Sequence, residues 1–205
     1  MVLIAAAPAA GHEATHDYES LVGAPAPASV TKGIEVRMLD QDSQVELVNH
    51  SGHTVVVIGY EGEPYARVAP DGTVSVNVRA PSTPESNDRW GHTVAKGTED
   101  ASAPPRWVRT GGDGTLRWFD RRTHHRGYGP PPEVVDRAVR TKIRDYRIPL
   151  RVDGEPAFIP GTLYWKGDPP FPALVAIAWL AAAGAAALLV AAVMGRRRRG
   201  AAPPA

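Results

Sequence analysis

The first residues of the chain carry a pattern that could bind zinc. His12 and His16 flank Glu13 in the arrangement H-E-x-x-H. On a helix this spacing places two imidazoles on one face, with the glutamate beside a metal-bound water. A metalloprotease needs the pattern within a stable helix that lines a cleft, and a third ligand from elsewhere. Here it stands within the first few residues of the expected mature chain, where ends fray, so the context disfavours a zinc protease.

A copper site is a second interpretation of the same residues. Signal cleavage after Ala9 would leave Ala10, Gly11 and His12 as the new N-terminus. A free amine, two backbone amides and an imidazole in third position form a planar nitrogen set that suits Cu(II) or Ni(II), and His16 could assist. Cleavage one residue later would move His12 to second position and weaken the site. The alternative, a solvated polar leader, stays open.

A second group of candidate metal ligands consists of Asp120, His124 and His125. On an extended strand the adjacent histidines would point to opposite faces, so only one of them could join Asp120 unless the segment is a loop. Arginines at positions 121, 122 and 126 disfavour a cation here and suit an anion. A metal site, a patch for an anionic partner and a solvated loop all remain open. Further His and Asp side chains that could contribute are His50, His53, Asp88 and His92.

Signatures of nucleophilic catalysis are missing from the sequence. It has no G-x-S-x-G, no Walker loop and no dinucleotide fingerprint. Glu61 and Glu63 could form a glycosidase pair, but beside Gly62 and before Pro64 they are expected to be solvent-facing charges in a turn. The chain has no cysteine, which excludes disulfides, thiolate metal sites and cysteine nucleophiles. We therefore expect no enzymatic activity and no bound cofactor other than Cu(II).

The elements that must position these residues are short β-strands. From Ile34 onward, β-rich runs alternate with turn signals such as Asp71-Gly72 and Asp153-Gly154. About seven or eight strands predict an all-β fold, an antiparallel β-sandwich of immunoglobulin-like architecture over 34–166. The runs are IEVRML, QVELVNH, TVVVIGY, YARVAP, TVSVNV, TLRWFD, YRIPLRV and AFIPGTLYW.

Other parts of this region carry weaker signals. Residues 11–33 are expected to form a flexible leader. Residues 79–112 are rich in Pro, Ser, Asn, Asp and Gly and predict a long loop, whose Trp90 and Trp107 should pack back on the sheets near Trp118. Residues 133–146 carry Val135, Val139 and Ile143 at four-residue spacing and are expected to form a short helix or an ordered loop.

The C-terminal part predicts one transmembrane helix. Residues 171–194 contain no charged side chain, and 24 residues of helix span roughly 36 Å, enough to cross a bilayer. Arg196–Arg199 follow at once, and Tyr164, Trp165 and Phe171 stand at the other end, where interfacial aromatics belong. The basic tail, 195–205, is therefore expected in the cytoplasm, and the bulk of the chain outside the cell membrane.

The N-terminal residues 1–10 resemble the end of a signal peptide, with an A-x-A-like cleavage site at Ala7–Ala9 but no positive n-region. Without Arg196–Arg199, 19 basic residues stand against 22 acidic ones. The remainder of the chain is thus mildly acidic, and no nucleic-acid partner is expected.

Four phrases carry a family resemblance. They resemble a family of actinobacterial membrane-anchored extracytoplasmic proteins to which no activity is assigned. The resemblance covers nearly the whole exported part, implies a β-rich domain with one C-terminal transmembrane helix, and transfers no catalytic residue. The phrases are GYEGEPYARVAPDG (59–72), PPRWVR (104–109), LRWFDRRTHHRG (116–127) and IPLRVDGEPAFIPGTLYW (148–165).

The sequence therefore predicts a single-pass membrane protein that displays a β-sandwich outside the cell membrane as a non-enzymatic binding or structural module. Its expected partners are the lipid bilayer and either another envelope protein or an anionic ligand. The alternative function is extracytoplasmic copper handling through the processed N-terminus and a His cluster.

Overall fold

The structure, a computed structural model, describes residues 17–87, 99–127 and 129–167, together with six positions between 177 and 186. The chain divides into two compact units, residues 1–167 and residues 168–205. In the second unit the described residues are all helical: Ile177, Trp179, Ala181, Ala183, Gly184 and Ala186. Among the residues that the structure describes, no helix is long and apolar enough to cross a membrane.

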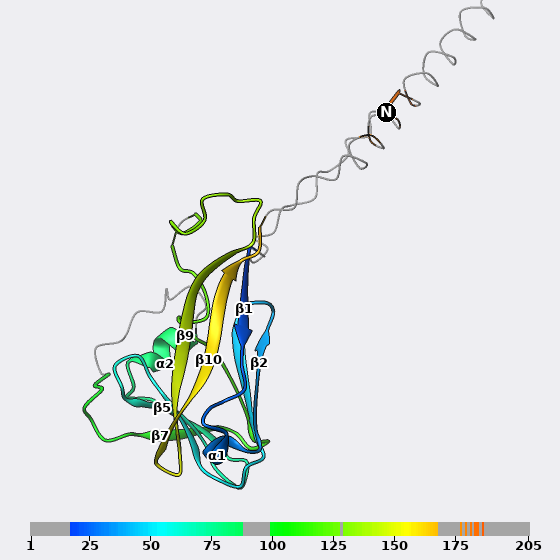
Figure 1. The fold of residues 1–205 in the computed structure, drawn as a ribbon. Helices are drawn as coiled ribbons and strands as arrows, with labels where there is room; N and C mark the ends of the chain where they lie inside the picture. Colours follow the sequence, from blue (N-terminus) through cyan, green and yellow to red (C-terminus); the bar gives the residue numbers. More distant parts are fainter. Residues whose placement is uncertain are drawn as a thin grey trace, which may run out of the picture. The chain divides into compact units, whose positions relative to one another are not determined.

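The first unit is built from antiparallel β-strands in two sheets (Figure 1). One sheet has seven strands in the order β1-β10-β9-β4-β5-β6-β7, and the other has three in the order β2-β3-β8. The helices α1 (Ala28–Thr31) and α2 (Ser82–Ser86) are short. The strands are β1 (Tyr18–Val22), β2 (Ile34–Leu39), β3 (Gln44–Asn49), β4 (Val55–Ile58), β5 (Pro64–Val68), β6 (Val74–Asn77), β7 (Trp107–Gly111), β8 (Thr115–Phe119), β9 (Thr141–Val152) and β10 (Glu155–Trp165).

Both sheets contribute to one hydrophobic core. Alternate residues along each strand point inward, because successive side chains of a strand face opposite sides of the sheet. The predicted all-β antiparallel fold is thereby confirmed, and Trp118 lies in the core as expected. Fully buried core residues are Val45, Leu47 and Trp118 from the three-stranded sheet and Val57, Ile148 and Ile159 from the seven-stranded sheet.

The predicted strands and turns are largely confirmed. The run IEVRML forms β2 without change, and four further runs contain β3, β4, β6 and β8. The runs YARVAP, YRIPLRV and AFIPGTLYW cover only part of β5, β9 and β10, which begin one, five and two residues earlier. The Asp153-Gly154 turn joins β9 to β10 with both residues at positive φ, 48° and 90°. Glycine and aspartate tolerate this left-handed backbone, so the turn residues make the tight hairpin possible.

Three predictions about the less regular segments need correction. The expected flexible leader contains β1 and α1, and β1 pairs along its whole length with β10, from Tyr18 opposite Trp165 to Val22 opposite Gly161. The expected 79–112 loop contains α2 and β7, while residues 88–98, with Trp90, lie outside the described residues. Of the residues 133–146, expected as a short helix or an ordered loop, 133–140 form the loop, but 141–146 belong to β9, which begins at Thr141.

The longest pairing in the fold joins β9 to β10. Its register runs from Glu155 opposite Val152 to Trp165 opposite Thr141. Within this pairing Gly161 lies opposite Tyr146, and the phenol ring of Tyr146 occupies the space that a side chain at Gly161 would fill. The Tyr146 hydroxyl forms a hydrogen bond of 2.6 Å with the hydroxyl of Ser20 on β1. This hairpin therefore holds β1 in place and sets the length of the domain (Figure 1).

Two of the aromatic residues expected at the membrane interface, Tyr164 and Trp165, have partners within the β domain. Trp165 is buried with Tyr18, Ile143 and Leu163 in a small second core, and its indole N–H donates to the Arg137 carbonyl at 2.9 Å. The Arg140 guanidinium lies over the Tyr164 ring, 3.7 Å from the ring centre. Tyr164 and Trp165 thus pack at the end of the sheet where β10 ends. Phe171, the rest of the predicted span 171–194, the tail 195–205 and the predicted signal segment 1–10 lie outside the described residues, apart from the six helical positions.

Candidate functional site

Asp120 follows β8 and is fully buried. Arg122 binds its carboxylate with two parallel hydrogen bonds, Nε to Oδ1 at 2.8 Å and Nη2 to Oδ2 at 2.7 Å. The Trp118 indole N–H and the Arg122 backbone N–H donate to the same two oxygens, each at 3.0 Å. A carboxylate offers about four acceptor positions. All of them are occupied, so Asp120 is the anion of a buried ion pair and has no oxygen lone pair to give a metal ion.

The two histidines have different surroundings. His124 is buried, and its Nε2 accepts a hydrogen bond from Arg126 Nε at 3.4 Å. His125 packs against the Tyr18 ring, with 5.4 Å between the ring centres. Burial, together with the nearby Arg144 guanidinium, lowers the pKa of His125, so its imidazole is neutral at pH 7. Asp120, His124 and His125 thus contact three different partners.

The described residues contain no group of three His, Asp or Glu side chains that could hold a metal ion. Because Asp120, His124 and His125 all belong to this part of the chain, the structure does not assemble the second predicted metal site. The N-terminal pair, His12 and His16, lies outside the described residues. A Cu(II) site there stays a prediction.

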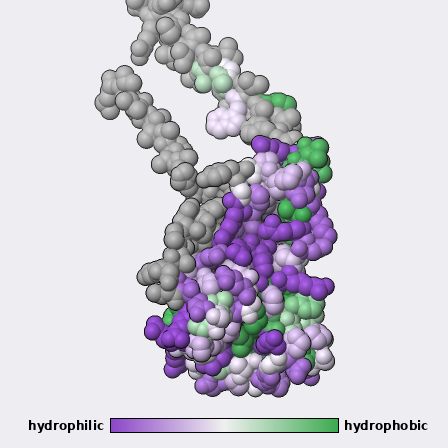
Figure 2. Space-filling view, turned by 90° about the vertical axis from the view of Figure 1, so that its left-hand side faces the viewer, coloured by the Kyte–Doolittle hydropathy of each residue, from purple (hydrophilic) through white to green (hydrophobic). Residues whose placement is uncertain are grey.

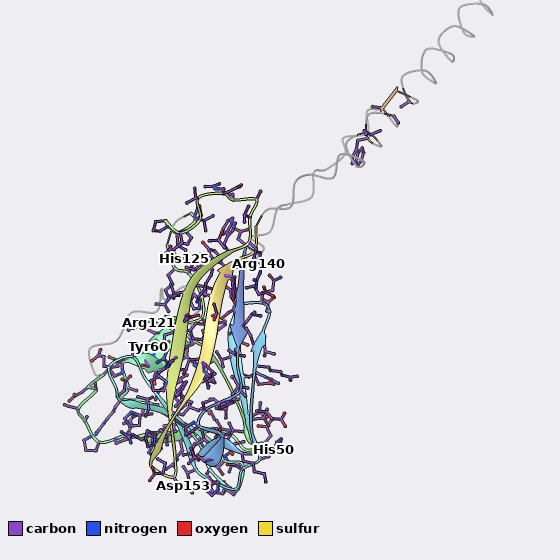
Figure 3. All side chains as sticks on the ribbon, viewed as in Figure 1. His50, Tyr60, Arg121, His125, Arg140 and Asp153 are labelled. Atoms are coloured by element: carbon purple, nitrogen blue, oxygen red, sulfur yellow. The ribbon has the colours of Figure 1, made fainter. Side chains whose placement is uncertain are left out.

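The arginines around this segment share acidic partners. Arg121 Nη1 and Arg126 Nη1 each lie 3.3 Å from the same Glu85 oxygen. The Arg121 guanidinium also stacks on the Tyr60 ring at 4.0 Å, and Figure 3 shows these two side chains together beside α2. Glu85 and Asp120 therefore offset part of the positive charge. Arg121 and Arg126 keep partial solvent exposure, and the anionic-partner patch stays a prediction.

Glu63 differs from the expectation of two solvent-facing carboxylates. Glu61 is exposed, but Glu63 is buried. The Glu63 carboxylate accepts hydrogen bonds from the Ser82 amide at 3.1 Å, the Ser82 hydroxyl at 2.5 Å and the Glu61 amide at 2.9 Å. It crosses directly over Gly59, where a Cβ atom would lie only 2.1 Å from Glu63 Oε1. Glu63 therefore fastens α2 to the β4–β5 turn.

A groove of about 710 Å³ lies over β1, β9 and β10. The exposed Leu21 side chain, Pro160 and Arg147 contribute to its lining, and Arg147 stacks on Phe158 at 4.5 Å. Asp145 also lines it and accepts hydrogen bonds from Lys142 at 2.7 Å and Thr162 at 2.8 Å. With an apolar wall and charges that already have partners, the groove suits the docking of a side chain better than acid–base catalysis.

A charged ladder crosses the outer face of the three-stranded sheet. Glu46 on β3 lies opposite Arg37 on β2 and opposite Arg117 on β8. Arg37 Nε and Arg117 Nε donate to its two carboxylate oxygens, the latter at 2.6 Å. The hydrogen bond from Arg37, followed by that from Arg117 and the two positive charges, holds the pKa of Glu46 below its ordinary value, although burial opposes this shift.

This ladder makes part of the stability depend on pH. Since the folded-state pKa of Glu46 is depressed, its contribution is fully present above the unfolded-state pKa of about 4.3 and is lost as the pH falls through the folded-state value. We expect Glu46→Gln to lower the free energy of unfolding at pH 7 by about 1 kcal/mol, since both arginines are largely exposed to solvent. The difference from the native protein should shrink at pH 3. Urea unfolding at both pH values checks this, and an equal difference at both would contradict it.

Sequence reasoning missed both the ladder and the groove. Their residues are separated by up to about 140 positions in the chain, and only strand order brings Leu21 beside Thr162 or Glu46 beside Arg117. The one local signal was the alternation of charged and apolar residues in β2, β3 and β8, which places Arg37, Glu46 and Arg117 on outer faces.

Comparisons with protein-family models, with curated proteins and with solved structures find no match for this chain. The family resemblance stays a prediction carried by the sequence phrases alone.

Proposed function

We propose that the protein is a single-pass membrane protein that displays its β domain outside the cell membrane as a non-enzymatic binding or structural module. The observation that carries this proposal is the place where the folded unit ends. The last strand, β10, ends at Trp165 and the compact unit ends at Gly167, and the uncharged segment 171–194, followed by Arg196–Arg199, begins four residues later. A spanning helix with cytoplasmic arginines would tether the domain closely to the outer surface.

The contacts of the acidic residues support a module without catalysis. A general acid or base must reach a proton of the substrate. The Asp120 carboxylate instead accepts hydrogen bonds from Arg122 and Trp118. The Glu63 carboxylate accepts hydrogen bonds from Ser82 and Glu61. The groove over β1, β9 and β10 supplies a surface on which an envelope protein could dock.

The finer architecture belongs to this proposal too. Two sheets around a common core support a β-sandwich, and we propose that the sheets are layered as in immunoglobulin-like domains. We also propose a transmembrane helix over 171–194. Copper handling stays the alternative function and is proposed for His12 and His16, since the described residues contain no group of three or more His, Asp or Glu side chains that could hold a metal ion.

The absence of native cysteine allows a clean test of topology. We expect a cysteine in the Glu155→Cys variant, in the exposed β9–β10 hairpin, to react with an impermeant maleimide on intact cells. A cysteine in the Ala202→Cys variant should react only after permeabilisation, because the basic tail would lie in the cytoplasm. Labelling of the two sites with the opposite sidedness, or recovery of the full chain in the soluble fraction, would refute the proposal.

A further inference from the structure

The loop 129–140, which leads into β9, exposes unusual apolar side chains. Val135 is 95% exposed and Val139 is 53% exposed. The loop begins with a run of prolines, Pro130–Pro132, whose fixed φ angles restrict its conformation. Valine side chains this exposed add little to the core, so packing within the domain does not explain why Val135 and Val139 are apolar.

The loop is held firmly in this conformation. The Trp165 indole binds the Arg137 carbonyl, and Val134 packs on the small second core formed by Tyr18, Ile143, Leu163 and Trp165. Inside the loop, Asp136 accepts hydrogen bonds from the backbone amides of Ala138 at 2.9 Å and Val139 at 3.2 Å. Val134 thus points inward and anchors the loop, while its neighbour Val135 is presented to the outside.

The loop lies directly against the point where the chain leaves the folded unit. A Cβ atom at Gly167 would approach the Ala138 carbonyl oxygen to 2.7 Å and the Arg140 nitrogen to 3.1 Å. From Gly167, at most about 14 Å of chain leads to Phe171, the first residue of the uncharged segment. The exposed valines and the proposed membrane entry are therefore close neighbours along a short tether.

Two cations beside the loop have acidic partners. Arg140 contacts Glu19 at 2.9 Å, and Lys142 contacts Asp145 at 2.7 Å. This end of the domain thus offers little excess positive charge to attract anionic headgroups, and its attraction to a surface must come mainly from apolar contact. In Figure 2 hydrophobic surface is visible at this upper end of the domain, above a mostly hydrophilic side.

We infer that the loop 129–140 rests on the outer surface of the lipid bilayer, with Val135 and Val139 inserted among the headgroups. The inference rests on the proposed membrane span. It also fixes the orientation of the domain, because the Asp153-Gly154 turn lies at the other end of the β9–β10 hairpin from Arg140 (Figure 3). Eleven register pairs at about 3.3 Å each place that turn about 36 Å along the hairpin from the end that carries the loop.

The test uses the full chain reconstituted in zwitterionic phosphatidylcholine vesicles, with a polarity-sensitive fluorophore on one introduced cysteine. Val135→Cys and Val139→Cys are the reporting variants, and both side chains are exposed, so neither change disturbs the core. Glu155→Cys, at the distant hairpin, is the matched control. We expect a blue-shifted emission and quenching by nitroxide-labelled lipid at Val135→Cys and Val139→Cys, with neither effect at Glu155→Cys.

Three other results would overturn the inference, each in a distinguishable way. If the protein resists carbonate extraction but the fluorophore at Val135→Cys shows the emission of an aqueous environment, the membrane span would stand and the contact of the loop with the bilayer would be refuted. A blue shift without quenching by labelled lipid would show that a protein, such as a second copy of the chain, covers the loop. Extraction of the protein by carbonate would remove the membrane span and the loop contact together.

Discussion

Asp120→Asn is expected to lower the free energy of unfolding by about 3 kcal/mol, the lower end of the range for breaking a buried ion pair. The variant keeps the shape of the side chain but replaces one acceptor oxygen by an amide, opposite the donors of Arg122 and Trp118. Arg122 is 19% exposed, so water relieves part of the cost of its lost partner. Urea unfolding followed by tryptophan fluorescence measures the change.

Asp113→Asn provides the matched control for this variant. Asp113 accepts one exposed hydrogen bond from the Thr115 amide, which asparagine can also accept, so a change within about 0.5 kcal/mol is expected. Adding Arg122→Met to Asp120→Asn should cost less than the sum of the two single changes, because the second removes the stranded cation. Equal effects of Asp120→Asn and Asp113→Asn would show that the ion pair contributes no net stability.

Glu63→Ala is expected to lower the free energy of unfolding by about 3 kcal/mol as well. The change leaves the Ser82 and Glu61 amides without their acceptor, and hydrogen bonds to a charged group are worth about 1.5–3 kcal/mol each, with partial recovery by water. Amide hydrogen exchange should also accelerate at Tyr60, whose N–H donates to the Ser82 hydroxyl at 2.8 Å.

The natural control is Glu61→Ala, two residues away in the same turn. Glu61 is exposed, so its replacement should change the free energy of unfolding by no more than about 0.5 kcal/mol. If the two variants were equally stable, the buried carboxylate would not be the link between α2 and the β4–β5 turn.

Local sequence patterns predict those parts of the fold that depend on local interactions. The boundaries of β2 follow from alternating residues between Gly33 and the Asp40 turn, and the hairpin at Asp153-Gly154 follows from turn chemistry. β1 and β7 escape this reasoning because their partners are distant. Tyr18 pairs with Trp165, and Trp107 pairs with Asn77 across the Pro-rich segment.

The candidate site illustrates the same limit for side chains. The sequence places arginines beside Asp120 but cannot tell a buried ion pair from an exposed basic patch, because burial depends on what covers Asp120. Glu63 looked like a turn carboxylate since its partner, Ser82, is 19 positions away. His125 contacts Tyr18 only because β1 pairs with the distant strand β10. Non-local packing therefore decides which charged residues are structural.

The pairing of β1 with β10 determines how the domain bears mechanical load. Asp17 and Lys166 meet at one end of this pair through a 2.7 Å backbone hydrogen bond. Pulling apart residues 17 and 167 stresses the cross-strand hydrogen bonds one at a time, so β1 peels away at low force. Pulling between Gly167 and the Asp153-Gly154 turn runs along β10, which is already extended. The covalent backbone of β10 then carries the tension. A force that a partner applies at the Asp153-Gly154 turn, along β10, therefore leaves the domain folded.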